Sequence, residues 1–231
     1  MKYILFGSTG QVGGAVARAL ADNPTCTGLT LVNRRPAGLA SVNAKVNEVI
    51  LATDAPDFAD RVAELARGHA AAVCCVGVGQ GTASIPEDQL LRLEVGVVGA
   101  YARGCHAAGV ERFAVLLAVG ITPASAESRI KYVRVMGKKL RALREVGFAE
   151  LAAFRPGTIT GNKHTPRWAA AVAKLLPDIG GYGAIHQDEI AAAFAAHLAR
   201  GRGSERMVYY DNKAMKAMGA ARRAGGATEA N

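Results

Sequence analysis

Three glycines near the start of the chain have the spacing of a phosphate-binding turn. They follow a short apolar run and precede a segment with helical periodicity, in the stretch Gly7, Ser8, Thr9, Gly10, Gln11, Val12 and Gly13. In such a strand–turn–helix unit the glycines allow a tight turn, close approach of a pyrophosphate and packing of the helix on the strand. The helix N-terminus points N–H groups at the phosphates. A glycine-rich structural turn is the alternative, but the context favours dinucleotide binding.

Two arginines after the second apolar run indicate which dinucleotide would bind. The run ends in Asn33, Arg34 and Arg35. A site specific for NAD usually has Asp or Glu here, which binds the ribose 2′-hydroxyl. Asn33 carries no charge, and guanidinium groups form paired, charge-assisted bonds with a phosphate. We therefore predict that NADP(H) is preferred over NAD(H); the alternative is a solvated basic loop.

Two further segments follow apolar runs and are candidates for the same crevice. Asp54 can accept a hydrogen bond from the adenine amine or cap the next helix, and the sequence leaves both roles open. Gly77, Val78 and Gly79 begin a second glycine-rich loop. Ligands of open α/β sheets bind at the carboxyl ends of the strands, so we expect this loop beside the cofactor.

Short apolar runs alternate with longer segments of helical period along most of the chain. The predicted strands cover residues 3–6, 29–33, 48–52, 71–76, 112–119 and 151–154. The predicted helices cover residues 11–21, 57–67, 86–108 and 125–146. Nearly continuous apolar strands separated by helices predict a parallel sheet covered on both faces. The fold class is therefore α/β, a doubly wound parallel sheet of the Rossmann type.

The alternation loosens after residue 154. We predict helices over 167–175 and 187–200, a strand over 207–210 and a helical turn over 213–218. This part is too short for a core of its own, so residues 1–218 form one domain in which about 156–218 cap the substrate side. Residues 219–231 are predicted to be a disordered tail.

Composition restricts the partners. The 231 residues carry a net charge of +9 with a pI near 9.7, which suggests an anionic partner. No apolar stretch reaches the length of a membrane span, and the N-terminal apolar run is too short for a signal peptide. We therefore predict a cytoplasmic protein with no membrane partner. The cysteines lack metal-ligand spacing, so we predict buried thiols and no metal at Cys26, Cys74, Cys75 and Cys105.

Basic residues are dense in the helix predicted over 125–146. Their offsets spread them around the helix, which is typical of a solvated face, and aromatic platforms for nucleic acid are missing. They are Arg129, Lys131, Arg134, Lys138, Lys139, Arg141 and Arg144.

Taken in order, these residues resemble the atypical branch of the short-chain dehydrogenase/reductase superfamily. The glycine turn, the arginine pair and the sequence Phe154-Arg155-Pro156-Gly157 match its pattern. The likeness extends to the Tat-interacting-protein-like NADP(H)-binding group and covers roughly residues 1–218. It implies a Rossmann domain that binds NADP(H) and an ancestry among oxidoreductases.

The resemblance also implies a catalytic Ser, Tyr and Lys. In such enzymes the Tyr hydroxyl transfers a proton, a Lys four residues later lowers its pKa and holds the ribose, and a Ser after the fifth strand orients the carbonyl. Tyr132 lies at the expected place, as a catalytic residue or as an aromatic contact of the ribose. The Lys position holds Met136, and the Ser position falls near Ala118 and Val119. Two of the three positions therefore cannot perform their role.

Other residues can be considered as substitutes. Thr122 or Ser125 can donate a hydrogen bond, and Lys139 lies on nearly the same helix face as Tyr132, one turn further on. In the resembling family the region of His164 and Trp168 often lines the substrate pocket. A histidine can transfer protons near neutral pH, although a loop histidine is more often a surface residue. His186, directly before the helix predicted over 187–200, is expected at a helix cap.

Two functional hypotheses follow. The first is an NADP(H)-dependent reductase that transfers hydride to a small carbonyl substrate through a degenerate site. The alternative is a non-catalytic NADP(H)-binding redox sensor or regulatory protein. Net charge alone motivates nucleic-acid binding, which the missing motifs argue against. The substrate is not identified, and a homodimer through the helices predicted over 86–108 and 125–146 is a candidate assembly.

Overall fold

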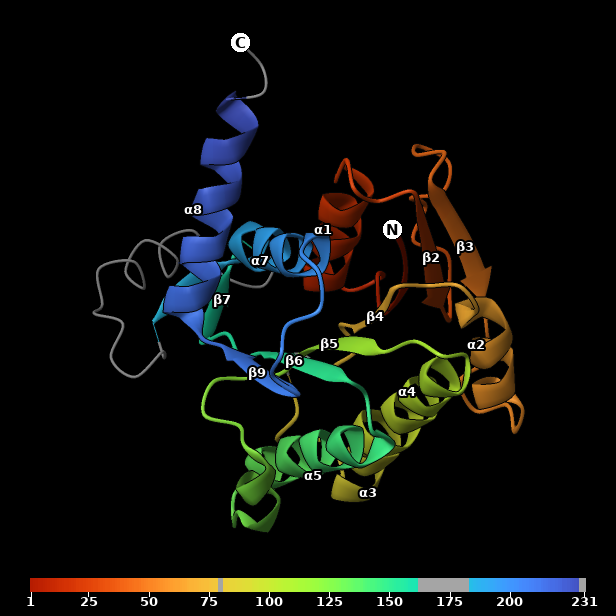
Figure 1. Cartoon of the computed structure of the whole chain (residues 1–231). Helices are drawn as coiled ribbons and strands as arrows, with labels where there is room; N and C mark the ends of the chain where they lie inside the picture. The colour runs from red at the N-terminus through yellow and green to blue at the C-terminus, as the bar shows by residue number, and fades with distance from the viewer. Residues whose placement is uncertain (79–80, 162–182, 229–231) are drawn as a thin grey trace.

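The computed structural model contains a seven-stranded parallel sheet with helices on both faces (Figure 1). It describes residues 1–78, 81–161 and 183–228, with side chains as far as residue 221. The strands are β1 (Lys2–Phe6), β2 (Gly28–Asn33), β3 (Val46–Ile50), β4 (Ala71–Cys74), β5 (Arg112–Leu116), β6 (Glu150–Phe154) and β9 (Met207–Tyr210).

The strand order is β3-β2-β1-β4-β5-β6-β9. Phe6 at the end of β1 is level with Val32 on β2 and Cys74 on β4. The order of the strands reverses between β1 and β4, which is where ligands bind in doubly wound folds. The predicted fold class is confirmed, and the predicted glycine segments follow the two strands at this switch point.

Two separate apolar cores cover the faces of the sheet. Helices α1 (Gln11–Ala21) and α7 (Gln187–Ala199) pack together on one face. Helices α2 (Phe58–Ala66), α4 (Val98–Ala107) and α5 (Lys131–Val146) cover the other face (Figure 1). Cys74 and Cys75 belong to different cores, as expected for neighbours in a strand. All four thiols are free and buried, as predicted.

Two of the predicted long helices are interrupted. The helix predicted over 86–108 consists of α3 (Glu87–Leu91), a π-helical turn η1 (Arg92–Val97) and α4. The segment predicted over 125–146 consists of a 3₁₀ helix η2 (Pro123–Glu127) and α5. A π-helical turn inserts an extra residue, and such turns are frequent at functional sites.

The C-terminal part differs from the predicted cap over 156–218. Strand β9 extends the main sheet beside β6, and α7 completes the core on the face of α1. Beyond the end of β6, β7 (Thr158–Thr160) and β8 (Ala184–His186) form a two-stranded sheet that we did not predict. The positions of these elements depend on strand pairing and burial between segments that are far apart in the sequence.

Residues 219–228, which were predicted to belong to a disordered tail, are part of a helix in the structure. Helix α8 (Asn212–Thr228) packs on α7 and continues past the predicted turn over 213–218 (Figure 1). The segment is rich in alanine, the best helix former, which offsets the glycines within it. The helix predicted over 167–175 lies outside the described residues. Within the described chain, no helix is long and apolar enough to cross a membrane.

Candidate functional site

The three glycines of the first turn perform three different tasks. Gly7 has a φ of +98°, and a Cβ there would lie 2.8 Å from the backbone nitrogen of Val76. A Cβ on Gly13 would lie 2.0 Å from the carbonyl oxygen of Gly7, so the helix could not pack on the strand. A Cβ on Gly10 would meet only the Gly7 oxygen, at 3.5 Å. Gly10 therefore borders open space, which leaves room for a phosphate against the backbone.

A cavity of about 700 Å³ extends from this turn to helix α5, along the ends of β1, β4 and β5. Among the predicted residues, it contains most of the glycine turn, part of the second loop and Tyr132. The lining residues are Thr9, Gly10, Gln11, Val12, Gly13, Arg35, Cys75, Val76, Gly77, Val78, Glu94, Leu116, Leu117, Tyr132, Met136, Lys139 and Ile159. Gly79 lies outside the described residues.

A second cavity of about 540 Å³ shares Thr9, Gly10, Gln11 and Arg35 with the first, so the two meet at the glycine turn. Arg18 also lines it. The Arg18 guanidinium folds back over the first turn of α1, since a Cβ on the neighbouring glycine at 14 would lie 3.6 Å from Arg18 Nη1. The cavity therefore has two guanidinium groups that can face an anion.

Gln187, at the start of α7, lines the same cavity. Its Oε1 atom is buried and has no hydrogen-bond partner in the described part of the chain. An unpartnered buried acceptor is costly unless a ligand or water satisfies it. The open space at Gly10 and the two arginines fit the phosphate of a bound dinucleotide, and the Gln187 oxygen can accept a hydrogen bond from a ribose hydroxyl.

Asn33 holds the loop in place instead of facing a cavity. It is 2% exposed, and its Nδ2 donates to Ser8 Oγ and to Glu48 Oε1, each at 2.7 Å. Glu48 also accepts the N–H groups of Ala37 and Gly38. The Ser8 hydroxyl is occupied by Asn33, although Ser8 borders the second cavity. These bonds fix the loop that carries the arginine pair.

Arg34 and Asp54 lie outside the two cavities at the glycine turn. Both side chains are exposed, and neither lines the two cavities, whereas Arg35 lines both. Helix α2 has Asp57 as its N-cap residue, so the capping role considered for Asp54 falls to Asp57 by position.

Three residues of α5 form the far wall of the first cavity: Tyr132, Met136 and Lys139. Lys139 is 1% exposed, and its Nζ donates to Val76 O and to Glu94 Oε2, each at 2.9 Å. The other oxygen of the Glu94 carboxylate accepts the Val78 N–H at 3.0 Å. The prediction of a solvated helix face is therefore wrong for Lys139, which is a buried cation with a buried partner.

Electrostatics keep Tyr132 in the phenol form. Burial raises its pKa, the Glu94 charge raises it further, and the Lys139 ammonium opposes them. Burial disfavours the charge on Lys139, but the attraction and hydrogen bond of Glu94, together with Cys74 and Tyr132, outweigh it, and the pKa of Lys139 is raised. At neutral pH Tyr132 can therefore donate a hydrogen bond or a proton, but it cannot act as a base.

No hydroxyl replaces the missing Ser among the described residues of this wall. At the end of β5 the cavity is lined by Leu116 and Leu117. Ser125 Oγ accepts the N–H of Thr122 at 3.0 Å, so the two candidate hydroxyl residues cap η2 and do not line the cavity. Cys75 lines the cavity, but burial raises the pKa of its thiol well above its usual range, which keeps it protonated.

The remaining candidates have structural roles or lie outside the description. His186 is the N-cap of α7, and its Nδ1 accepts the N–H of Asp188 at 3.3 Å, as predicted. Arg155 packs its guanidinium 4.1 Å from the centre of the Tyr209 ring. His164 and Trp168 lie outside the described residues. Within that description, no group of three or more His, Cys, Asp or Glu side chains could hold a metal ion.

Sequence reasoning missed Glu94 and undervalued Lys139. Glu94 lies among residues of helical spacing that are otherwise apolar, such as Leu90 and Val98, and Lys139 lies between Met136 and Leu140. The available signal was a carboxylate within the apolar stripe of one predicted helix and an ammonium within the apolar stripe of the following helix. Charged groups are almost never fully buried unless they are paired.

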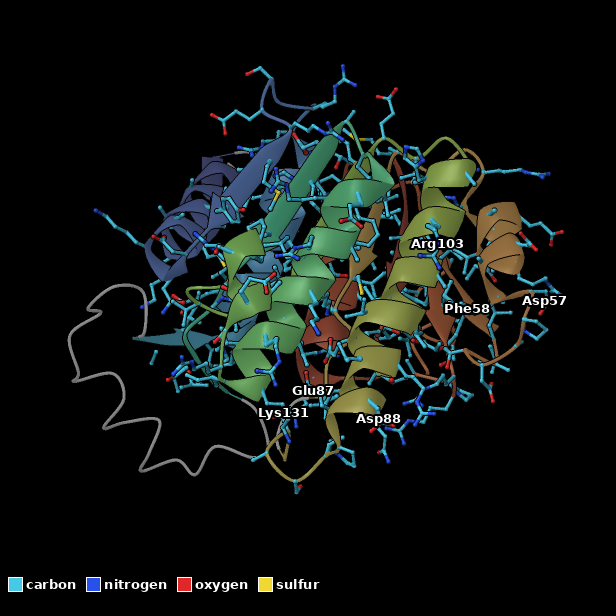
Figure 2. All side chains as sticks on the ribbon, turned by 90° about the horizontal axis from the view of Figure 1, so that it is seen from below. Asp57, Phe58, Glu87, Asp88, Arg103 and Lys131 are labelled. Atoms are coloured by element: carbon cyan, nitrogen blue, oxygen red, sulfur yellow. The ribbon has the colours of Figure 1, made fainter. Side chains whose placement is uncertain are left out.

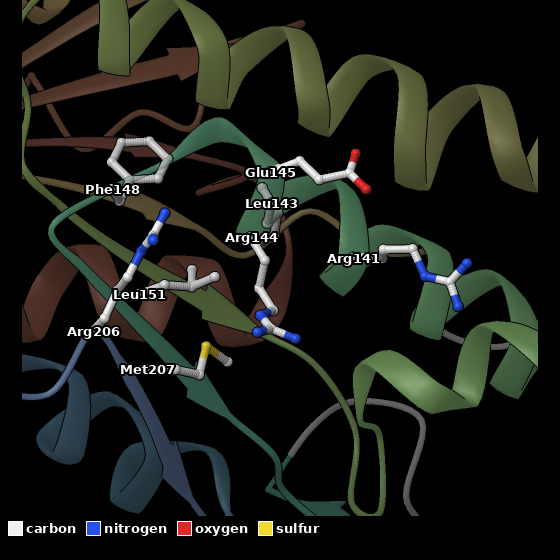
Figure 3. A pocket seen from close by; sticks show the side chains of 8 residues that line it. All are labelled: Arg141, Leu143, Arg144, Glu145, Phe148, Leu151, Arg206 and Met207. Atoms are coloured by element: carbon white, nitrogen blue, oxygen red, sulfur yellow. The ribbon is translucent and has the colours of Figure 1, made fainter.

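A smaller hollow of about 350 Å³ lies between the end of α5 and β9 (Figure 3). Arginine side chains surround an apolar floor that includes Leu151 and Met207. None of the predicted site residues lines it, so we assign the candidate site to the two cavities at the glycine turn.

Comparison with known proteins gives a consistent result. A family model described as NAD(P)H-binding matches residues 7–201. The protein fmp52, mitochondrial, of Emericella nidulans is 26% identical over 183 residues, 79% of this chain and 76% of that protein. The oxidoreductase ylbE of Lactococcus lactis superimposes with a TM-score of 0.63 at 16% identity, covering 94% and 96% of the two chains. Triphenylmethane reductase of Citrobacter sp., complexed with NADP(H), gives 0.65 at 16% identity, covering 91% and 69%. These structures confirm the predicted fold.

The curated relatives overturn the prediction of a cytoplasmic protein. Proteins from Emericella nidulans, Aspergillus fumigatus and Scheffersomyces stipitis carry the word mitochondrial in their names. The prediction depended on the shortness of the first apolar run, which addresses secretory signals only. Mitochondrial leaders are amphipathic and Arg-rich, so that criterion does not detect them.

Proposed function

Because the chain belongs to the NAD(P)H-binding family, we propose that it is an NADP(H)-dependent reductase acting on a small carbonyl compound. The observation that carries this proposal is the first cavity, which connects the glycine turn to the phenol of Tyr132. A cofactor whose phosphates lie on the turn would extend along this cavity toward α5.

The preference for NADP(H) is supported by the second cavity. Arg18 and Arg35 line it, and neither has an ion-pair partner among the described residues. The nearby carboxylate of Glu48 is engaged by Asn33 and by backbone N–H groups, so it is held within the loop. Two guanidinium groups without a competing free carboxylate favour a 2′-phosphate.

The chemistry requires little of the protein beyond orientation and one proton. NADPH, when bound, would supply hydride to a carbonyl carbon. Tyr132 would donate a hydrogen bond to the carbonyl oxygen and then its proton, and solvent would restore the phenol. Apolar side chains, including Leu117, Met136 and Ile159, border the same space, so the substrate body is apolar.

The cofactor preference is tested by titrating NADPH and NADH and following cofactor fluorescence. We expect Arg35→Ala to weaken NADPH binding about tenfold, equivalent to about 1.4 kcal/mol, with little change for NADH. Arg34→Ala is the matched control and should change either affinity less than about twofold. Equal affinities of the unaltered protein for NADPH and NADH would contradict the preference.

Catalysis is tested by following NADPH oxidation with a panel of apolar aldehydes, ketones and quinones. Tyr132→Phe should reduce the rate about 10²-fold, because it removes the proton donor. Activity that is unaffected by this substitution would remove Tyr132 from the mechanism.

A second candidate is a non-catalytic NADP(H)-binding redox sensor. The apolar wall at Leu116 and Leu117, with Met136 in the usual Lys position, favours it. It predicts different affinities for NADPH and NADP⁺ and no turnover with any carbonyl compound in the panel. Turnover that depends on Tyr132 would exclude it.

A further inference from the structure

We propose that Glu94 and Lys139 form a positioning pair that fixes the turn over residues 76–78 against the Tyr132 end of the cavity. The inference depends on the proposed function only for the identity of the ligand. Neither residue matches a position that the family resemblance assigned to catalysis.

Two hydrogen bonds connect the pair to the turn, and a third joins its two members. Lys139 Nζ donates to Val76 O at 2.9 Å, and Val78 N–H donates to Glu94 Oε1 at 3.0 Å. The ammonium and the second carboxylate oxygen close the link at 2.9 Å. Both ends of the turn are therefore held, and Gly77 between them has no side chain that would fill the cavity.

The local structure explains why these residues reach the turn. Glu94 lies in the π-helical turn η1 and is 2% exposed, and Lys139 comes from the buried face of α5. Helix α5 also holds the far end of the same loop, since Lys131 Nζ donates to Ala83 O and Ile85 O, each at 2.8 Å. The predicted solvated face thus supplies two anchors for the loop after β4.

A buried ion pair is a costly way to stabilise a fold, because apolar residues of similar volume do as well or better. Its geometry here has a specific use. The carboxylate accepts two separate donors with two separate oxygens, and an amide has only one acceptor oxygen. Glu94→Gln must therefore lose either the Val78 contact or the Lys139 contact while it preserves side-chain size.

The matched control is a second carboxylate on the same helix pair. Glu87, at the start of α3, pairs with Arg134 of α5 at 2.6 Å, near Lys131 and outside the cavity lining (Figure 2). Glu87→Gln removes one carboxylate charge that faces α5 from α3, one element before η1, without touching the turn.

The experiment compares the full chain with Glu94→Gln, the double variant Glu94→Gln with Lys139→Met, and Glu87→Gln. For Glu94→Gln we expect at least tenfold weaker NADPH binding and at least tenfold faster hydrogen exchange at the Val78 amide without cofactor. The Tyr132 phenol, assigned by difference from Tyr132→Phe, should titrate at lower pH. The Glu87 variant should stay within twofold in affinity and exchange.

The double variant removes both charges and keeps the proposal testable if the single variant does not fold. It should bind NADPH at least tenfold more weakly while its circular dichroism remains native. Native affinity and native Val78 exchange in a folded Glu94 variant would overturn the proposal. If the unaltered protein does not bind NADPH, the proposed function fails, and Val78 exchange still decides the positioning role.

Discussion

Two buried ionic clusters lie at opposite ends of the strands and have different surroundings. Glu94 and Lys139 lie at the carboxyl ends of the strands and line the cavity. At the amino ends, Arg112 begins β5 and Glu150 begins β6, with Nε and Oε1 2.9 Å apart. His197 Nε2 lies 3.1 Å from the same Glu150 oxygen.

The amino-end cluster is closed by backbone. Arg112 donates to the carbonyl oxygens of His197, Leu198 and Arg200 at 3.0, 3.4 and 3.0 Å. The last carbonyls of a helix have no partner within it, so Arg112 satisfies the end of α7. No residue of this cluster lines the described cavities. Burial of charge is therefore common to both clusters and does not by itself indicate a candidate site. Only the Glu94–Lys139 pair lines one of these cavities and binds the turn beside it.

The largest expected effect is a loss of unfolding free energy when the amino-end cluster is broken. Arg112→Met leaves a buried carboxylate and three carbonyls without their donor, so it should lower the free energy of unfolding by about 3–5 kcal/mol. Urea denaturation measures this loss, and NADPH affinity of the folded variant should remain unchanged. A loss below about 1 kcal/mol, or weakened NADPH binding, would contradict the division between the clusters.

The next effect is acid sensitivity of the amino-end cluster. Burial lowers the pKa of His197 to about 4, with Arg112 and Arg200 acting in the same direction and Glu150 opposing. The unfolded chain takes up this proton near pH 6.5 and the folded chain only near pH 4. The free energy of unfolding should therefore fall by about 3 kcal/mol between these values.

Urea denaturation at pH 7, 5 and 4 measures this fall, and His197→Gln should flatten the profile. The raised pKa of Lys139 has the opposite sign. Its contribution is present below the unfolded pKa of about 10.4 and is lost only as the pH rises through the folded value. A steep acid slope that persists without His197 would show that another group is responsible.

A smaller loss is expected from Lys139→Met alone. It leaves Glu94 without its cation, but the adjacent cavity admits water, so about 2 kcal/mol of stability should be lost. Adding Glu94→Gln should recover part of the loss because it removes the unpaired charge. A double-mutant cycle in urea measures the coupling. Strictly additive losses would show that the two residues do not act as a pair.

The smallest effect is expected from Glu87→Gln. Its partner Arg134 lies near the surface, where water and salt screen an ion pair. We expect no measurable change in the unfolding midpoint or in NADPH affinity. A clear change in either would place the start of α3 within the site and remove it as a control.

Most strands and the glycine turn could be predicted because their signals are local. Apolar runs and glycine spacing mark β1 and α1, and the predicted bounds of α1 equal those observed. The role of Asn33 could not be read in this way, since its partners Ser8 and Glu48 come from the turn after β1 and from the middle of β3. The π-helical turn at Glu94 was hidden for a similar reason, because helical period alone does not locate an inserted residue.

The sequence by itself determined the fold class, the glycine turn after β1, and the absence of the usual Ser and Lys from their positions. Those features depend on residue type at short spacing. Tertiary structure alone decided that Lys139 and Glu94 meet, that Arg18 joins Arg35, and that β9 completes the sheet. Glu94 and Lys139 are 45 positions apart in the chain, Arg18 and Arg35 are 17 apart, and β9 is further still from its partner β6. Only the packing of elements brings them together. The chemistry of the candidate site therefore depends mainly on the contacts that tertiary structure decided.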